Sequence, residues 1–123
     1  MITYTFLTSL PTLNEYSNAE RRHRHKAAAM KKKAENGLVM ELMIMGAKPI
    51  TSQVHLHYHW IMKDKRKDKD NIAFAQKFVQ DALVKAGVLR NDGWAEVDGF
   101  THHFSVNKEI PCLILSIEEL SNE

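Results

Sequence analysis

The sequence predicts an α+β domain in which two main helices pack on a small mixed β-sheet. Two long segments have helical composition without internal proline, and short segments rich in β-branched and aromatic residues lie before, between and after them. The predicted order is β-α-β-β-α-β-β. A chain of 123 residues, 44% of them hydrophobic, has the ordinary size of one domain, so residues 1–123 are predicted to fold as a single unit.

The chain begins with a predicted strand and a long helix. Residues 2–8 (ITYTFLT) are β-branched and aromatic and lead into a turn-prone segment at Ser9 and Pro11. Helix-forming residues fill positions 14–35, and Asn36-Gly37 is typical of a helix end.

Two more strands are predicted before the second helix. Residues 38–45 (LVMELMIM) are apolar apart from Glu41, so this strand would be buried on both faces, either under a helix or against a second copy of the chain. The run is too short to span a membrane. Residues 53–61 alternate in polarity, which predicts a half-buried strand. Its polar face carries His55, His57 and His59. These histidines form either a Zn²⁺ site or a surface that faces solvent, DNA or a partner.

The second helix is predicted to begin at Asp70-Asn71 and to end at Gly87, with an apolar stripe facing the core. Residues 94–106 and 111–117 predict two last strands, joined as a hairpin through residues 107–109. His102 and His103 would point to opposite faces of the first of them. The aromatic residues predicted to lie in the core rather than to stack on bases are Trp60, Trp94 and Phe100.

Charge is distributed unevenly along the chain, although the net charge is only +2. The segment from residue 21 to residue 33 contains no acid, which predicts either a patch for a polyanion or a solvated helix face. Its cations are Arg21, Arg22, Arg24, Lys26, Lys31, Lys32 and Lys33. The single cysteine, Cys112, and the lack of a signal-peptide pattern predict a cytoplasmic protein.

The segment KDKRKDKDN, residues 63–71, mixes acids and bases most densely. Asp68 and Asp70 are two residues apart, so in a strand-like segment their carboxylates would lie on one side and repel each other unless a cation lay between them. Hard oxygen ligands of this kind suit Mg²⁺ or Mn²⁺. The cations that would neutralise DNA phosphates beside such a metal are Lys65, Arg66, Lys67 and Lys69. The alternative is a charged surface loop whose opposite charges satisfy each other in water.

Several short motifs at fixed spacing carry a resemblance to a known family. They are Lys67-Asp68-Lys69-Asp70-Asn71, Lys77, Asp81-Ala82-Leu83, Gly87-Val88 and Asn91-Asp92. Together they resemble the signature of the RusA family of Holliday junction resolvases. The N-terminal segment SLPTLNEYSNAERRHRHKAAAMKKK resembles phage- and prophage-type members of that family, so the similarity extends over most of residues 2–106.

The resemblance implies a RusA-like fold and a homodimeric, Mg²⁺-dependent endodeoxyribonuclease that resolves four-way DNA junctions by paired nicking, in recombination, repair or phage DNA processing in a bacterial cell. By motif position, Asp68, Asp70 and Asp92 would be the metal ligands. Lys77, four residues before Asp81, would be the helix lysine, although the spacing from Asp70 to Asp81 is about one helical turn longer than usual in the family. If the family's spacing is counted from Asp70 instead, the lysine position falls on Phe74, which carries no charge.

Three other functions remain open from the sequence. The first is a DNA-binding protein without catalysis, and the second is a nuclease for branched DNA in general. The third is a regulatory metal-binding protein that uses the histidine strand. Mn²⁺ is expected to replace Mg²⁺ in the nuclease.

Overall fold

A computed structural model describes residues 1–120, so the last three residues of the predicted single domain lie outside the described part. The elements follow one another in an order that differs from the predicted one. They are β1 (Ile2–Phe6), α1 (Leu13–Arg22), α2 (Arg24–Ile44), β2 (Val54–Met62), α3 (Lys69–Ala73), α4 (Gln76–Lys85), β3 (Val97–Val106) and β4 (Cys112–Glu119).

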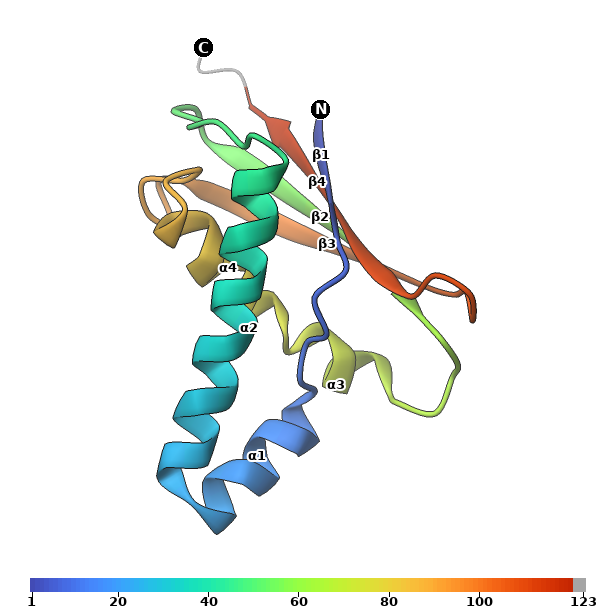
Figure 1. The fold of residues 1–123 in the computed structure, drawn as a ribbon. Coiled ribbons are helices and arrows are strands. Elements are labelled where there is room, and N and C mark those ends of the chain that lie inside the picture. Colours follow the sequence, from blue (N-terminus) through green and yellow to red (C-terminus); the bar gives the residue numbers. More distant parts are fainter. Residues whose placement is uncertain (121–123) are drawn as a thin grey trace.

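The four strands form one mixed sheet in the order β1-β4-β2-β3. Strand β4 pairs antiparallel with both β1 and β2, whereas β3 pairs parallel with β2. The helices lie on one face of this sheet (Figure 1). This arrangement confirms the predicted α+β class.

Strands β3 and β4 do not form the predicted hairpin, because β2 lies between them in the sheet. The connection crosses the end of β2, where the backbone N–H of Asn107 donates to the carbonyl of Met62 at 2.8 Å. The side-chain oxygen of Asn107 accepts from the N–H groups of Glu109 and Ile110 at 3.0 and 3.2 Å. Such an asparagine turn looks the same in sequence whether it joins neighbouring strands or passes over the end of a third.

The predicted strand over residues 38–45 is wrong, because these residues continue helix α2. Leu38 and Leu42, one helical turn apart, are completely buried, whereas Met40 and Met43 are 64% and 73% exposed. A strand buried on both faces, and a dimer contact made by such a strand, are therefore absent from this region. Gly37 does not end the helix. A Cβ at that position would lie 2.9 Å from side-chain atoms of Thr8, so the glycine allows the segment after β1 to approach α2.

The first predicted helix is divided at His23, whose backbone is extended with φ −165° and ψ 118°. Helix α1 begins with a capping box. The Thr12 hydroxyl accepts from the Glu15 N–H, and the Glu15 carboxylate accepts from the Thr12 N–H, both at 3.3 Å. Residues 20–26, around the corner between α1 and α2, are all exposed.

The second predicted helix is also divided, by a turn at Phe74 and Ala75 between α3 and α4. Its end is confirmed by Gly87, which has a φ of +78°. The predicted apolar stripe is buried and meets the sheet and α2. The largest fully buried side chains of this core include Phe6, Leu38, Leu42, Leu56, Tyr58, Phe78, Leu83, Leu115 and Ile117.

The opposite face of the sheet carries no helix in the described residues (Figure 1). Strand β2 alternates as predicted, with its histidines on this open face and its apolar residues beneath the helices. Trp60 lies in the core as expected, but Trp94 is 98% and Phe100 43% exposed, so the core prediction is wrong for these two. None of the described helices is both long and apolar enough to cross a membrane.

Candidate active site

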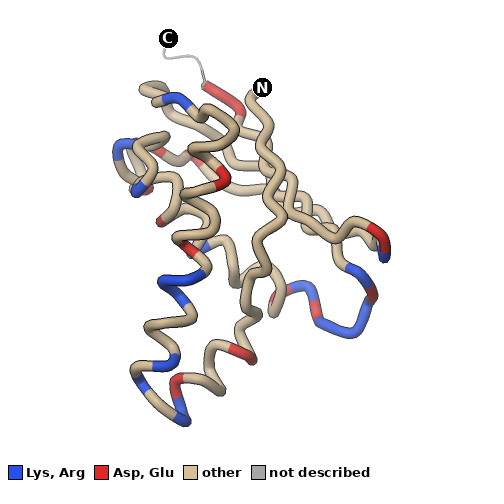
Figure 2. The backbone as a smooth tube through the Cα atoms, viewed as in Figure 1, with Lys and Arg blue, Asp and Glu red and all other residues tan. Residues whose placement is uncertain are grey.

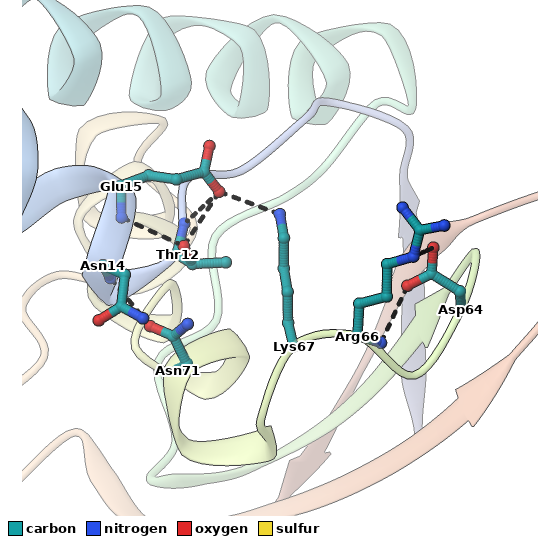
Figure 3. A network of polar contacts seen from close by, with 7 residues as sticks. All are labelled: Thr12, Asn14, Glu15, Asp64, Arg66, Lys67 and Asn71. Atoms are coloured by element: carbon teal, nitrogen blue, oxygen red, sulfur yellow. Dashed lines mark hydrogen bonds and ion pairs between the residues drawn. The ribbon is translucent and has the colours of Figure 1, made fainter.

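In the segment KDKRKDKDN, residues 63–68 form the loop between β2 and α3 and residues 69–71 begin α3. Cationic and acidic residues are mixed here beyond the end of the sheet (Figure 2). The first acid of the segment is used within the loop. Asp64 accepts a hydrogen bond from the backbone N–H of Arg66 at 3.0 Å, and its second oxygen lies 3.7 Å from Arg66 Nε (Figure 3). Asp68 and Asp70 form no ion pair with a described residue, so their charges remain available for a ligand.

Asp68 and Asp70 line a cavity of about 810 Å³ between this loop and the end of β3. The lining also includes Phe104, Ser105 and Val106 of β3, together with Met62 and Ile72. Three cations of the same segment, Lys65, Lys67 and Lys69, line this cavity too. Carboxylate and lysine side chains therefore line one space, as a site for a divalent cation and a phosphate requires.

The backbone turns between the two aspartates. Asp68 is extended, with φ −70° and ψ 150°, and precedes α3, whereas Asp70 lies in the first turn of that helix. The strand-like arrangement expected for this pair is therefore wrong. One oxygen of Asp70 accepts from the N–H of Asn71 at 2.9 Å, and the Asp68 side chain makes no capping bond to α3.

Two side chains tie the loop and α3 to α1 (Figure 3). The amide oxygen of Asn71 accepts from the backbone N–H of Asn14 at 2.9 Å, so Asn71 caps α1. The prediction that Asn71 would cap its own helix is therefore wrong. Lys67 Nζ donates to Glu15 Oε1 at 3.0 Å. Burial raises the pKa of Glu15, but hydrogen bonds from Lys67 and Thr12 outweigh it, and the pKa lies below its ordinary value. Ionised Glu15 therefore holds the ammonium of Lys67, one of the residues that line the cavity, at α1.

Asp92 lies apart from that pair, in the segment between α4 and β3. Burial of Tyr58 raises the pKa of its hydroxyl, and the negative charge of Asp92 raises it further. The same hydroxyl donates to the side-chain oxygen of Gln80 at 3.1 Å. Asp92 is not among the residues that line the cavity, and within residues 1–120 no three His, Cys, Asp or Glu side chains are grouped closely enough to hold a metal ion. This conformation does not assemble the predicted three-aspartate ligand set.

Lys77 is not among the residues that line the cavity. Its ammonium donates to Asp81 Oδ1 at 3.2 Å, and the second oxygen of Asp81 lies 3.7 Å from Lys31 of α2. Phe74, the other position that the spacing allows, packs against the rings of Tyr16 and Phe78, each with centroids 5.6 Å away. The residues between Asp70 and Asp81 include the turn that separates α3 from α4.

The basic stretch predicted to bind DNA follows the corner between α1 and α2 and the first half of α2 (Figure 2). Arg21, Arg22, Arg24 and Lys26 are exposed at the corner, and Lys32 and Lys33 are exposed further along α2. Lys31 differs from them because it is half-buried and paired with Asp81. Helix α1 therefore connects the exposed cations to the aspartate loop through Glu15 and Asn14.

The histidines on the open face of β2 each have a polar neighbour. His55 lies 2.7 Å from the hydroxyl of Thr101 and 3.3 Å from Asp98, His57 lies 2.9 Å from Glu118, and His59 lies 2.7 Å from the hydroxyl of Ser105. No metal-binding group is found on this face within the described residues. These contacts give the histidine strand the properties of a polar surface.

The sequence analysis did not identify His102 as a candidate site residue. His102 accepts a hydrogen bond from Trp60 Nε1 at its Nδ1, at 2.9 Å, on the helix side of the sheet. The sequence predicts only that it points away from His103, which is confirmed. Its partner lies on the neighbouring strand, 42 residues away, so no local pattern marks the pair.

A scan against models of protein families and a search of curated proteins give no match to this chain. The resemblance to RusA resolvases therefore stays a prediction that depends on the motif residues themselves.

Proposed function

We propose that this protein is a divalent-metal-dependent endonuclease that cuts branched DNA, with the four-way junction as its preferred substrate. The observation that supports the proposal most strongly is the cavity in which Asp68 and Asp70 meet Lys65, Lys67 and Lys69. A purely structural charged loop would pair its acids with its bases. Here only Asp64 is paired in that way, while the two motif aspartates are left open.

Mg²⁺ fits the residues present, because it keeps several waters and takes only one or two carboxylates from a protein. Asp68 and Asp70 would hold it, and Asp92 would join them only if the segment between α4 and β3 moved towards the cavity. When bound, the ion would polarise the scissile phosphate and lower the pKa of a water molecule. Mn²⁺, which has the same preference for oxygen ligands, would replace it.

The residues of the chain would position the DNA strand for hydrolysis, in which water forms a new P–O bond and a sugar oxygen leaves the phosphorus. Lys65 and Lys69 would bind phosphate oxygens at the cavity. Lys67, held by Glu15, would lie next to α1. The exposed cations of the α1–α2 corner would bind phosphates further along the same branched substrate.

Preference for a four-way junction is supported by the family resemblance of the motifs. A homodimer with two-fold symmetry would match the near-symmetry of such a junction, so that each site would cut one of two opposed strands. The proposed role of Lys77 in this reaction requires release from Asp81, because its ammonium is now 3.2 Å from that carboxylate.

The test compares cleavage of a synthetic four-way junction and of a linear duplex of the same sequence, in Mg²⁺ and in EDTA. Three proteins are needed: the natural chain, Asp70→Asn, and Asp98→Asn, which makes the same change on the open face of the sheet. We expect paired nicks near the branch point that require Mg²⁺ and disappear only in Asp70→Asn. Loss of charge at Asp70 should lower the rate about 100-fold or more, because metal catalysis supplies several kcal/mol.

Two other results would reject parts of the proposal. Junction binding in EDTA without cleavage in Mg²⁺ or Mn²⁺ would make the protein a DNA-binding protein without catalysis. Equal cleavage of junctions, flaps and forks would make it a nuclease for branched DNA in general.

A further inference from the structure

His102 is held in one protonation form by its neighbours. Because the indole N–H of Trp60 donates to Nδ1, that nitrogen must be unprotonated, and the neutral ring then carries its proton on Nε2. Burial, with a smaller effect of the neighbouring His103, lowers the pKa of His102 and favours the neutral ring. Nε2–H is therefore a fixed hydrogen-bond donor near neutral pH.

The ring is also fixed in orientation by aromatic neighbours. It stacks on Tyr58, with centroids 5.0 Å apart and 15° between the planes, and on Trp60, at 6.1 Å and 14°. The ring of Phe104 lies 6.4 Å from it, with 23° between the planes. These contacts leave the imidazole little freedom to rotate.

The Nε2 atom is open to a ligand. No described residue forms a side-chain hydrogen bond with it, and within residues 1–120 the only buried side-chain polar atom without a partner is the hydroxyl oxygen of Ser52. Since Nε2 is not such a buried atom, it reaches solvent. A fixed donor that stays open in the free protein has the properties of a group that binds an acceptor from outside.

His102 lies next to the cavity on the helix side of β3. Phe104, two residues further along the same face, lines the cavity of Asp68 and Asp70, and its ring centroid is 6.4 Å from that of His102. His102 is half-buried, whereas its cross-strand neighbour Tyr58 is completely buried. A DNA strand that continues from the cavity along this face of β3 would therefore reach His102.

We infer that His102 contacts the DNA substrate in this site, with its Nε2–H donating a hydrogen bond to a phosphate oxygen of the strand. The inference rests on the proposed nuclease function and adds a neutral donor to the lysines of the loop. Unlike an ammonium on a long flexible chain, the imidazole is already oriented, so it can fix the position of one phosphate at little cost in side-chain entropy.

The test uses three variants in single-turnover cleavage of the four-way junction. His102→Phe keeps an aromatic ring but removes the donor, and His102→Gln restores an N–H donor close to the position of Nε2. His103→Phe makes the same change at the next residue, on the opposite face. We expect His102→Phe to lower the rate about 10- to 100-fold, as for loss of one hydrogen bond to a charged group. His102→Gln should recover most of that loss, and His103→Phe should cut at the natural rate.

A binding measurement in EDTA separates contact from structural support. Junctions that carry a single methylphosphonate, which removes one charged oxygen, are scanned across the phosphates around the branch point. One position should weaken binding to the natural protein and have no effect on binding to His102→Phe, because that contact is already lost.

The results distinguish this inference from the proposed function. If the natural protein cuts the junction but His102→Phe cuts equally fast, or if every methylphosphonate acts equally on both proteins, the His102 contact is rejected and the nuclease stands. If the natural protein cuts no DNA in Mg²⁺ or Mn²⁺, the nuclease function itself fails, and the role of His102 in it fails too.

Discussion

The histidines on the two faces of the sheet differ in the kind of partner that they have. On the open face, His55, His57 and His59 each have a ring nitrogen beside a hydroxyl or carboxylate of an adjacent strand. On the helix side, His102 has one ring nitrogen beside the indole N–H of Trp60, which can only donate. The partner of His102 therefore fixes which ring nitrogen carries the proton, whereas a hydroxyl partner does not.

The difference follows from what covers each face. Helices α2 and α4 exclude water from much of the helix side, so polar groups there must find partners or contact a ligand. The open face is hydrated, and its polar pairs are replaceable by water. The predictions below test this contrast.

Removal of a buried side chain in the covering layer should have the largest effect on stability. Leu38→Ala should lower the free energy of unfolding by about 2–5 kcal/mol, because Leu38 is completely buried between α2 and the rest of the core. Met40→Ala, two residues away on the exposed side of the helix, should change it by less than about 0.5 kcal/mol. Urea unfolding of both variants measures the difference. Equal losses would mean that residues 38–45 form the two-sided buried strand that their sequence predicts.

Loss of the N-terminal cap of α1 should lower the stability of the protein by a smaller amount. Thr12→Ala removes the hydroxyl that accepts from the Glu15 N–H and should cost about 1 kcal/mol. Ser17→Ala, inside the same helix, removes a hydroxyl without a capping bond and should not destabilise the protein. If thermal unfolding shows equal losses for the two variants, the capping box does not contribute in solution.

The ion pair between Glu15 and Lys67 should give a weak dependence of stability on pH. The pKa of Glu15 is lower in the folded protein than its ordinary value of 4.5, so its contribution is present above that pH and is lost as the pH falls through the folded pKa. Both side chains are about half exposed, so the loss is expected to be a few tenths of a kcal/mol. Glu15→Gln should therefore be less stable than the natural protein at pH 7 and equally stable at pH 3.

The control for this experiment is Glu20→Gln, an exposed glutamate of the same helix. Glu20 forms no ion pair with a described residue, so this variant measures the effect of losing a carboxylate of α1 that has no such partner. A difference for Glu15→Gln that persists at pH 3 would show that the charge of Glu15 is not what stabilises the contact.

The smallest expected effect is on the open face. His57→Ala removes an exposed pair with Glu118 and should change junction cleavage by less than about twofold, since surface pairs contribute about 0–1 kcal/mol to stability and this one does not face the cavity. A large loss of cleavage in this variant would move the site to the opposite face of the sheet.

The sequence predicted the elements whose information is local. Alternation identified β2, the apolar stripe identified the segment that forms α3 and α4, and charge density identified the loop with Asp68 and Asp70. The prediction of a strand over residues 38–45 was wrong because eight nearly continuous apolar residues fit a buried strand or a helix equally well. The prediction of a helix end at Gly37 was wrong because the sequence does not distinguish a glycine that ends a helix from one that allows a neighbouring segment to approach closely.

Relations across the sheet were not predictable from the sequence. The parallel pairing of β2 and β3 depends on which strands are neighbours, and that pairing places His102 beside Trp60 and Phe104 beside the aspartates. The pairing of Asp81 with both Lys31 and Lys77 likewise depends on how α4 packs against α2. Motif spacing names the residues of a site but does not place them in space.

The most direct test of the central claim, that the cavity of Asp68 and Asp70 binds the catalytic metal, is to map the metal on the protein. Fe²⁺ replaces Mg²⁺, and peroxide with ascorbate then generates radicals that cut the polypeptide near the bound ion. The account predicts fragments that end close to residues 68–70 and 104–106, competed away by Mg²⁺ and absent in Asp70→Asn. Fragments that end at residues 55–59, or a pattern unchanged by Asp70→Asn, would contradict it.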